Sequence, residues 1–486
     1  MANNNNNNSK KNEAITSREE NFAQWYTDVC RKAELMDYAS VKGFIDYLPY
    51  SYAIWEEIQA YLNKRFKEDL GSSNVYLPMV IPTSLFNKEK EHVEGFAPET
   101  LVATMGGGKK LDDPLVIRPT SEILFTDLYK RLVSSYRDLP KCYNQWCSVV
   151  RWEKTTRPFL RGSEFLWQEG HCIFETEQEA VENALKARQV YEDLGRELLA
   201  IPFLTGEKTE HERFAGAVHT YTVEALMHDG KTLQSGTSHY LGTGFTKAFG
   251  VNFLGRQNKL EAPHQTSWGA STRLIGAVIM VHGDDNGLVL PPRVAPIQVV
   301  IVPIRMQTPG VLEACYKMRD VIKAEGVRVY LDEDDSRTPG WKFAQYEMKG
   351  VPLRIEVGPR DLEKGEAVLT RRVDGLKQTL KIEDIEKEIP GVLDEIHEAM
   401  YKKAKENLES HIYEVSSIEE MKEALDSKGG FAKMDFCGDP ECEDRIKEIT
   451  GGASTRCIAT TDVDEDATCP CCGKKAKMKV YFGKAY

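Results

Sequence analysis

Two segments in the middle of the chain contain arginines that are costly to bury unless they bind an anion. In the first, Arg151 follows an apolar, strand-like run, and a polar loop then leads to Arg161. A buried guanidinium needs an anionic partner, and its planar fork suits a phosphate or a carboxylate. A structural pairing of Arg151 with Glu153 or Glu164 would explain the same pattern without any ligand.

The second segment, 267–273, reads Ser-Trp-Gly-Ala-Ser-Thr-Arg and precedes an apolar run over 274–281. Its glycine and small side chains permit close approach of a flat ligand, and Arg273 adds a positive charge. A simple turn before a helix would give the same local pattern.

Six of the 11 cysteines lie between Cys437 and Cys472. Cys469 and Cys472 are separated by two residues and followed by a glycine, which is typical of a zinc knuckle, and Cys437 and Cys442 supply a second pair. Four thiolates fill a tetrahedral site, so we expect a structural rather than a catalytic metal. Cys471 is an alternative ligand in place of Cys469 or Cys472, and the cysteines could also carry no metal.

The elements that position these residues follow an α+β pattern, with residues 17–70 predicted to be helical and a further helix predicted after Thr176. Ser17 followed by Glu20 gives a capping-box signal for the first, and Thr176 with Glu179 caps the second. Strands are predicted over 74–80, 115–118, 146–153, 165–174, 218–226 and 233–239. Antiparallel strands with helices on one side fit this order. From residue 296 the spacing changes to strand–helix–strand, with strands over 297–303, 327–331 and 353–357, which indicates a parallel sheet. We therefore expect an Asn-rich disordered terminus over 1–16 and domains over 17–295, 296–404 and 405–486.

Charge and composition exclude several classes of protein. With a net charge of -12, the chain is not a nonspecific polyanion binder, although a local basic surface would still permit RNA binding. No apolar run approaches the length of about 20 residues that spans a bilayer. The asparagine run Asn3–Asn8 is low-complexity and lacks a secretory signal, so we expect a cytoplasmic protein without membrane contact.

Taken together, the motifs resemble those of class II aminoacyl-tRNA synthetases, and in detail those of the prolyl-tRNA synthetase family. Pro78 resembles the proline of motif 1, and the two arginine segments resemble motifs 2 and 3. The stretches that carry the resemblance are Arg118-Pro-Thr-Ser-Glu122, Asn144-Gln-Trp-Cys147, Val150-Arg-Trp-Glu153, Phe159-Leu-Arg161, Phe165-Leu-Trp-Gln-Glu-Gly-His171, Gly236-Thr-Ser-His239, Ser267-Trp-Gly269, Val281-His-Gly-Asp284 and Gly287-Leu-Val-Leu-Pro-Pro-Arg293.

The resemblance implies an enzyme that activates L-proline with ATP and transfers it to tRNA(Pro), with Mg²⁺ on the phosphates and Arg151 as the catalytic residue. It implies a proline site made of Thr120, Glu122, Arg151, Trp167, Glu169, His171, Phe214 and His239. It implies an ATP site made of Arg151, Glu153, Arg161, Gln234, Thr237, Ser271 and Arg273. It also implies an antiparallel catalytic sheet, a homodimer and a structural zinc on Cys437, Cys442, Cys469 and Cys472.

The length of chain between motifs 2 and 3 indicates which subtype of the family this chain resembles. About 100 residues separate Phe165 from Ser267, too few for ordinary elements plus an extra domain of typical size. The chain therefore resembles the archaeal and eukaryotic-like type, which lacks the editing insertion and ends in a small α/β zinc domain. Residues 296–400 resemble an α/β anticodon-binding domain, with basic residues beside Trp341, Phe343 and Tyr346.

Two other functions stay open at this stage. A paralogue that kept the fold but lost catalysis is disfavoured because Glu122, Arg151, Arg161 and Arg273 are all present. A threonyl or histidyl enzyme is disfavoured because the active-site motifs do not show the zinc ligands expected of a threonyl enzyme and because the segment Arg118–Glu122 points to proline.

Overall fold

The computed structural model describes residues 15–90 and 99–486. The chain divides into two compact units: Met1–Asp37, Asp46–Glu57 and Val278–Lys403 form unit 1, and Tyr38–Ile45, Ile58–Ala277 and Ala404–Tyr486 form unit 2. The asparagine run and its predicted disorder lie outside the described residues. The predicted domain boundaries stay predictions.

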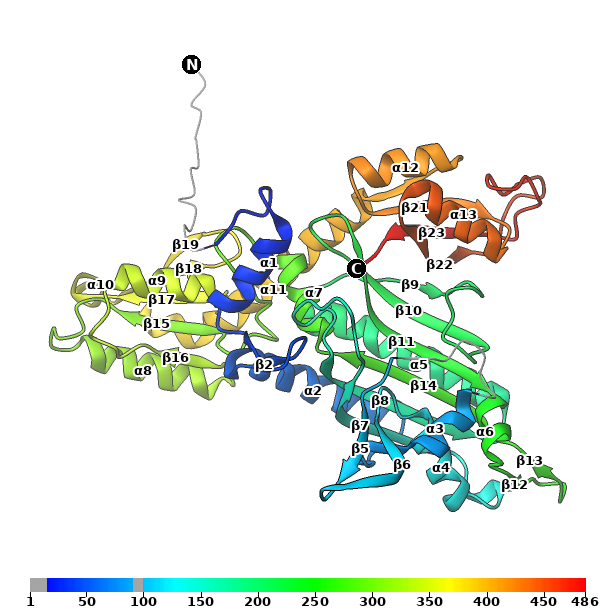
Figure 1. Ribbon diagram of the computed structural model, residues 1–486. Coiled ribbons are helices and arrows are strands. Elements are labelled where there is room, and N and C mark those ends of the chain that lie inside the picture. The colour runs from blue at the N-terminus through cyan, green and yellow to red at the C-terminus, as the bar shows by residue number, and fades with distance from the viewer. Residues whose placement is uncertain (1–14, 91–98) are drawn as a thin grey trace. The chain divides into compact units, whose positions relative to one another are not determined.

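Unit 2 is built on a seven-stranded sheet that the sequence predicts in outline (Figure 1). β3 pairs in parallel with β7, and each of the other neighbouring pairs is antiparallel. In sheet order the strands are β3 (Ser73–Asn74), β7 (Lys141–Val150), β8 (Glu164–Phe174), β14 (His264–Ser271), β11 (Thr232–Gly242), β10 (His219–Leu226) and β9 (Leu204–Glu207).

Helix α5 (Glu177–Leu194) covers one face of this sheet and contacts β8, β10, β11 and β14. The predicted cap at Thr176 is confirmed and has the geometry of a capping box, because the Thr176 side chain accepts from the Glu179 N–H and the Glu179 carboxylate accepts from the Thr176 N–H. The helix buries a stripe at helical spacing: Ala180, Asn183, Ala184, Ala187, Val190, Tyr191 and Leu194. Because successive side chains of a strand point to opposite faces, every second residue of these strands points away from α5, to the other face of the sheet.

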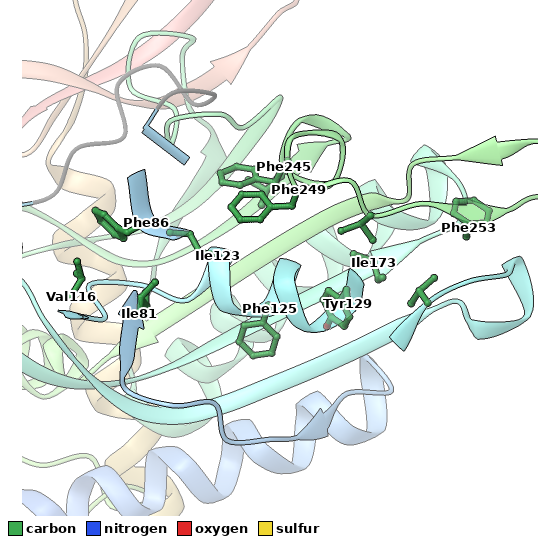
Figure 2. Packing of buried hydrophobic residues seen from close by; sticks show 13 residues of the cluster. Ile81, Phe86, Val116, Ile123, Phe125, Tyr129, Ile173, Phe245, Phe249 and Phe253 are labelled. Carbon is green, nitrogen blue, oxygen red and sulfur yellow. The ribbon is translucent and has the colours of Figure 1, made fainter. Parts of the chain in front are cut away.

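An aromatic-rich core supports this opposite face at one end, as Figure 2 shows. Phe125 and Tyr129 project from α4 (Glu122–Leu132), and Phe245 and Phe249 project from α6 (Gly244–Phe249). The Tyr129 hydroxyl donates to the backbone oxygen of His171 at 2.7 Å, which fixes α4 against β8. Burial of these rings fixes the N-terminal end of α4, where the segment 118–122 lies.

The remaining elements of the predicted catalytic region are shorter. A three-stranded sheet pairs β6 with β4 and β5. The bounds are β4 (Val80–Pro82), α3 (Thr83–Lys90), β5 (Val102–Gly106), β6 (Lys109–Ile117), β12 (Phe253–Leu254) and β13 (Leu260–Glu261), with a 3-10 turn over Tyr136–Asp138 and a π turn over Gly195–Leu199.

The C-terminal part of unit 2 forms a four-stranded sheet with two helices packed on it. The strands in sheet order are β20 (Ile412–Glu414), β21 (Phe431–Phe436), β23 (Met478–Lys484) and β22 (Ala453–Thr460), and the helices are α12 (Ile418–Ser427) and α13 (Pro440–Thr450). β9 and β22 approach so closely that a Cβ on Gly206 would lie 2.8 Å from the backbone oxygen of Ile458. The glycine at this position therefore permits the C-terminal part to pack on the edge of the catalytic sheet.

Unit 1 contains a five-stranded mixed sheet. β15 pairs in parallel with β16 and β17, as the sequence predicts, whereas β18 and β19 extend the sheet in antiparallel pairing. The strands are β15 (Val299–Pro303), β16 (Val329–Leu331), β17 (Leu353–Val357), β18 (Glu366–Arg371) and β19 (Lys377–Lys381). The helices of the same region are α8 (Val311–Ala324), α9 (Pro339–Met348) and α10 (Pro359–Lys364), with a 3-10 turn over Ile382–Asp384.

The prediction that residues 17–70 are helical is confirmed for two segments and is wrong for the residues between them. The structure has α1 (Phe22–Lys32), two short strands β1 (Met36–Tyr38) and β2 (Ile45–Tyr47), and then α2 (Pro49–Asp69). Asn21, not Ser17, caps α1, because the Asn21 side chain accepts from the Gln24 N–H. Two further helices of the described residues are α7 (Arg273–His282) and α11 (Ile385–Ser410). Within 15–90 and 99–486, no helix is long and apolar enough to cross a membrane.

Candidate active site and cysteine cluster

A cavity of about 250 Å³ lies over the face of the catalytic sheet that α5 leaves uncovered. The strand registers explain which residues line it. Thr237 of β11 pairs with Gly269 of β14, and Gly269 pairs with Glu169 of β8, so the three form one row across the sheet. Because side chains on one strand repeat every second residue, His171 and Trp167 point to the same face as Glu169.

The alternating residues on the other face pack against α5 and hold the rows in place. The Ser238 hydroxyl donates to the backbone oxygen of Ala184 at 2.7 Å, and Gln168 donates to the Tyr191 hydroxyl. A Cβ on Gly170 would lie 2.2 Å from the ring of Trp268, so only glycine fits there. The sequence segment Phe165–His171 thus alternates between lining the cavity and packing under it.

The start of α4 adds a carboxylate to the cavity wall. Glu122 is the first residue of the helix and is buried, and its Oε2 accepts a hydrogen bond from the Thr120 hydroxyl. The neighbouring Ser121 N–H donates to Oε2 of Glu169 at 3.0 Å, which ties α4 to β8. One ligand atom each of Glu122, Glu169 and His171 lies within 4.8 Å of the others, an arrangement that suits a cationic ligand group.

Glu169 is held in its charged form by hydrogen bonds. Burial by itself would raise its pKa, but hydrogen bonds from His171, Ser121 and Gln145 together bring the pKa below the ordinary value. Nε2 of His171 lies 3.1 Å from Oε2 of Glu169, and the imidazole stacks on Phe125 with ring centroids 4.3 Å apart. Glu169 therefore presents a fixed negative charge at the floor of the cavity.

Arg151 contributes a positive charge to the cavity. Burial lowers the pKa of its guanidinium, and the charges of Glu122, Glu169 and Glu153 act against that effect. Nε of Arg151 donates to the backbone oxygen of Pro119 at 3.0 Å, and the guanidinium carbon lies 5.4 Å from the ring centroid of Trp167. These contacts orient the guanidinium by a carbonyl and a ring and leave its charge to act on a ligand.

Arg273, at the start of α7, is the second cavity arginine. Its Nε donates to the backbone oxygen of Leu160 and its Nη1 to that of Gln234, each at 3.1 Å. Burial, followed by the charges of Arg151 and Arg161, lowers its pKa to about 10. Clustered cations of this kind favour binding of an anionic ligand, because each cation destabilises the charged form of the other and a bound anion offsets this repulsion.

His239 and Phe214 form an uncharged part of the wall, with ring centroids 4.7 Å apart. Burial, and then the charges of His171 and Lys208, lower the pKa of His239 to about 3, so it is neutral at physiological pH. Nδ1 of His239 lies 3.0 Å from the Thr220 hydroxyl. This wall suits a compact apolar group of a ligand.

Most residues expected in the site come together at this one cavity. They are Thr120, Glu122, Arg151, Trp167, Glu169, His171, Phe214, Gln234, Thr237, His239, Ser271 and Arg273. Glu153 and Arg161 lie outside the set of lining residues. Arg161 is exposed, yet it is near enough to Arg273 for its charge to affect the pKa of that residue.

Sequence reasoning missed several lining residues, among them Lys208, Glu212, Arg213 and Thr220. All but Thr220 come from the segment between β9 and β10, which carries a mixture of charges typical of an exposed loop. Lys208 is nevertheless buried. Lys208 contacts the C-terminal sheet through the backbone oxygen of Arg456, a contact that no local pattern reveals.

The cysteine cluster forms in the C-terminal part of unit 2. The sulfur atoms of Cys437, Cys442, Cys469 and Cys472 lie within 4.8 Å of one another, and those of Cys437 and Cys472 are 3.7 Å apart. Tetrahedral thiolates on zinc, with bonds of about 2.3 Å, have sulfur atoms about 3.8 Å apart. Sγ of Cys471 instead lies 3.7 Å from the backbone oxygen of Cys442. The donor set therefore fits a four-thiolate metal site without Cys471.

Comparison with known proteins defines the class of protein. Residues 105–282 match the tRNA synthetase class II core domain (G, H, P, S and T), residues 298–391 match the anticodon binding domain, and residues 418–486 match the domain described as prolyl-tRNA synthetase, C-terminal. The fold and cavity are thus those of a class II aminoacyl-tRNA synthetase.

Full-length relatives narrow the class to one family. Proteins named proline--tRNA ligase from Lachnoclostridium phytofermentans and Lachnospira eligens are each 54% identical over 474 residues, covering 98% of this chain and 98% of theirs. A third, from Acetoanaerobium sticklandii, is 54% identical over 472 residues, covering 97% of this chain and 98% of its own. The chain belongs to the prolyl-tRNA synthetase family.

Proposed function

We propose that this chain is a proline--tRNA ligase that forms prolyl-adenylate in the cavity over the catalytic sheet and transfers the prolyl group to the 3′ end of tRNA(Pro). The observation that carries the proposal is the meeting of two carboxylates and two arginines in a cavity of the class II core. Glu122 and Glu169 supply negative charge for the secondary ammonium of proline, and Arg151 and Arg273 supply positive charge for its carboxylate and for ATP.

The first step is attack by a carboxylate oxygen of proline on the α-phosphorus of ATP, with release of diphosphate. Arg151 is the catalytic residue in this proposal, because its guanidinium would neutralise both anions where they approach one another. Thr120 and Glu122 would hold the ammonium, and Trp167, His171, Phe214 and His239 would enclose the ring. Glu169 would orient His171 and share the charge of the ammonium.

The ATP site is proposed on the opposite side of Arg151. Arg273 and Arg161 would contact the outer phosphates or the adenine, with Glu153, Gln234, Thr237 and Ser271 completing the site. Mg²⁺ supplied with ATP would offset phosphate charge. In the second step the terminal hydroxyl of the tRNA attacks the prolyl carbonyl and AMP leaves.

Proline-dependent exchange of radioactive diphosphate into ATP tests the first step without tRNA. We expect exchange with proline and none with threonine or histidine, and charging of tRNA(Pro) in the complete reaction. A protein that lacks proline-dependent exchange but binds tRNA would be a paralogue without catalysis and would overturn the proposal.

The cysteine cluster is proposed to hold a structural zinc. Four thiolates complete a tetrahedral shell, so no coordination position remains for substrate chemistry. A reducing cytoplasm, the proposed compartment, keeps such thiols available for metal. Metal analysis of the purified chain should find about one zinc per chain, and protein that is fully folded without metal would contradict this assignment.

We further propose the subtype without an editing insertion, in which a zinc domain ends the chain. Residues between β8 and β14 are occupied by α5, β9, β10, β11, α6, β12 and β13, and three of these strands belong to the catalytic sheet. The enzyme should therefore leave preformed alanyl-tRNA(Pro) intact, and rapid hydrolysis of that substrate would contradict the subtype.

A homodimer is also proposed. Apolar side chains are exposed on and beside the small sheet of β4, β5 and β6: Tyr76 68%, Met79 48%, Leu101 37%, Val102 41% and Met105 62%. Apolar surface of this extent marks an interaction site more often than a solvated face. Sedimentation at micromolar concentration should give twice the chain mass, and a Met105→Glu variant should shift it toward the monomer.

A further inference from the structure

A buried carboxylate, Glu224, lies behind the cavity wall and is shared between two cations from different parts of the chain. Glu224 is 0% exposed. Its Oε1 lies 3.4 Å from Nζ of Lys208, which lines the cavity, and its Oε2 accepts from Nε and Nη2 of Arg456 at 3.2 Å and 2.8 Å. Arg456 belongs to β22 of the C-terminal sheet and is itself buried. The C-terminal part thus contributes a charge directly behind the active site.

The backbone irregularity at Glu224 shows how the carboxylate reaches this place. The register of β10 against β11 shifts between Val223 and Glu224, and a bulge of this kind re-aims the side chain that follows it. The Thr222 hydroxyl donates to Oε1 of Glu224 at 2.9 Å. The carboxylate is therefore held between β10 and β22 by hydrogen bonds on both of its oxygens.

A second set of contacts joins the same two parts beside Lys208. The hydroxyls of Thr209 and Thr455 lie 2.8 Å apart, and both donate to Glu443 of α13, at 3.1 Å and 2.6 Å. Lys208 also donates to the backbone oxygen of Arg456 at 3.3 Å. These contacts fix the beginning of the segment that carries Lys208 and Phe214 into the cavity wall.

Within ion-pair distance, the Glu224 carboxylate faces two cations, so these three groups together carry a net positive charge. Lys208 is the one of the two cations that lines the cavity, and Glu212, which also lines it, acts on Arg456 by its charge. An ammonium has three N–H donors. In the part of the chain that the structure describes, Glu224 and the Arg456 carbonyl accept two of them, which leaves one for an anionic ligand.

We propose that Arg456 is a positioning residue for the ATP site: it neutralises Glu224 from the C-terminal domain, so that the Lys208 ammonium keeps its charge for the phosphates of ATP. The inference rests on the proposed ATP site. Without Arg456, Lys208 and Glu224 form a neutral pair and the ammonium turns to the carboxylate. In this proposal the C-terminal domain affects the affinity for ATP through the side chain of Arg456.

Arg456→Met, measured by proline-dependent diphosphate exchange, tests this inference. Loss of one charge-assisted hydrogen bond to ATP should raise the KM for ATP about 10-fold and leave the KM for proline nearly unchanged. Lys208→Met should have the same effect, and Lys208→Met with Arg456→Met should be no worse than either alone. Arg456→Lys should restore most of the ATP affinity. The control is Lys433→Met, which removes a partly exposed cation from the same C-terminal sheet and should change neither KM.

A second double variant tests whether Arg456 acts through its charge or has only a structural role. Glu224→Gln combined with Arg456→Met removes both charges, so Lys208 again carries a surplus charge and the KM for ATP should return toward that of the unmodified enzyme. This double variant also removes the buried carboxylate that Arg456→Met leaves with a single cation, Lys208. If the double variant binds ATP as poorly as Arg456→Met, or if Arg456→Met raises both KM values equally, the inference is overturned.

Equilibrium dialysis with ATP alone separates this inference from the proposed function. If the unmodified chain binds ATP but shows no proline-dependent exchange, the proposed function fails while the Arg456 effect on ATP affinity is still measurable. Unchanged ATP affinity in a folded Arg456→Met protein would overturn the inference even in an active enzyme.

Discussion

Nε2 of His171 lies 3.1 Å from Oε2 of Glu169 at the floor of the cavity, and both side chains are buried. The two residues are two positions apart on β8 and so share a face of the sheet. Glu169 keeps a lowered pKa against the effect of burial because His171 leads the hydrogen bonds and charges that favour its charged form. The stability of this region therefore depends on the pair rather than on either residue.

Replacing His171 by phenylalanine should lower the stability of the protein at neutral pH and make that stability less dependent on acid pH. A carboxyl whose folded pKa is lowered contributes stability above its unfolded pKa, and that stability is lost as pH falls through the folded pKa. In His171→Phe the pKa of Glu169 rises toward or above its unfolded value, so this stability is already missing at pH 7 and little of it is left to be lost on acidification. Thermal denaturation followed from pH 7 to pH 4 measures this difference. His219→Phe, which removes a partly exposed histidine of the same sheet, is the control; equal acid sensitivity in both variants would contradict the argument.

Glu122→Gln should separate proline binding from ATP binding. The variant keeps the shape of a buried side chain that accepts from Thr120 but removes the negative charge facing the ammonium. Because hydrogen bonds to charged groups contribute about 1.5–3 kcal/mol, the KM for proline should rise at least about 10-fold, with the KM for ATP nearly unchanged. Asp127→Asn, on the exposed face of α4, is the matched control. An unchanged KM for proline would place the ammonium elsewhere.

Much of the cavity could be predicted because its residues fall on alternating positions of long strands. Trp167, Glu169 and His171 are spaced by two along β8, and the resemblance placed them in one site. The strand order could not be read from local patterns, since β14 lies between β8 and β11 although the 89 residues from 175 to 263 separate β8 from β14. The row of Thr237, Gly269 and Glu169 appears only once that order is known.

Residues that depend on distant packing escaped prediction. Lys208 looks like an exposed lysine in a charged loop, and its burial accompanies contacts with Glu224, on the next strand, and with Arg456, 248 residues away in sequence. The helical prediction over 17–70 missed the interruption between two helices for a local reason. Glu34 and Gly43 adopt positive φ angles of 58° and 89°, which break the helix between α1 and α2.

Trp341→Ala should weaken tRNA charging more than adenylate formation. Trp341 is 46% exposed and Arg337 lies over its ring at 4.7 Å, a surface on which an unstacked base can pack. Stacking of one base contributes about 1–3 kcal/mol, so the KM for tRNA should rise about 10-fold while diphosphate exchange stays normal. Tyr316→Ala removes another exposed aromatic that lies under an arginine of the same unit and is the control.

Lys349→Glu is a second test of the same domain, and it should also lower charging more than exchange. Lys349 pairs with Glu34 at 2.5 Å, and its Nζ lies 5.5 Å from the ring centroid of Tyr50. Charge reversal would disrupt those contacts as well, so Trp341→Ala reports more directly on tRNA. Equal losses of charging and exchange in Trp341→Ala would contradict an anticodon-binding role.

Cys469→Ser and Cys471→Ser should differ sharply in metal content. Cys469 is buried within the group of four sulfur atoms, whereas Cys471 faces the backbone oxygen of Cys442. The first variant should lose zinc and unfold the C-terminal sheet at a lower temperature, because metal binding is coupled to folding. The second should keep about one zinc per chain. Zinc loss in Cys471→Ser with retention in Cys469→Ser would reverse the ligand assignment.

The proposed proline pocket should also activate cysteine to a measurable extent. Its wall combines the uncharged His239 with Phe214, so it selects for a compact side chain more by shape than by hydrogen bonds. Discrimination by shape alone between ligands that differ by one methylene group is limited to about 10- to 200-fold, and cysteine is similar in volume to the proline ring. Diphosphate exchange with millimolar cysteine should therefore exceed the background, and alanine should give a weaker signal.

Glu122→Gln supplies the internal control for cysteine activation, because both amino acids present an ammonium to the same carboxylate. The variant should raise the KM for cysteine and for proline by similar factors. Complete exclusion of cysteine by the unmodified enzyme would show that the wall discriminates by more than shape. Loss of proline activation alone in Glu122→Gln would show that cysteine occupies a different site.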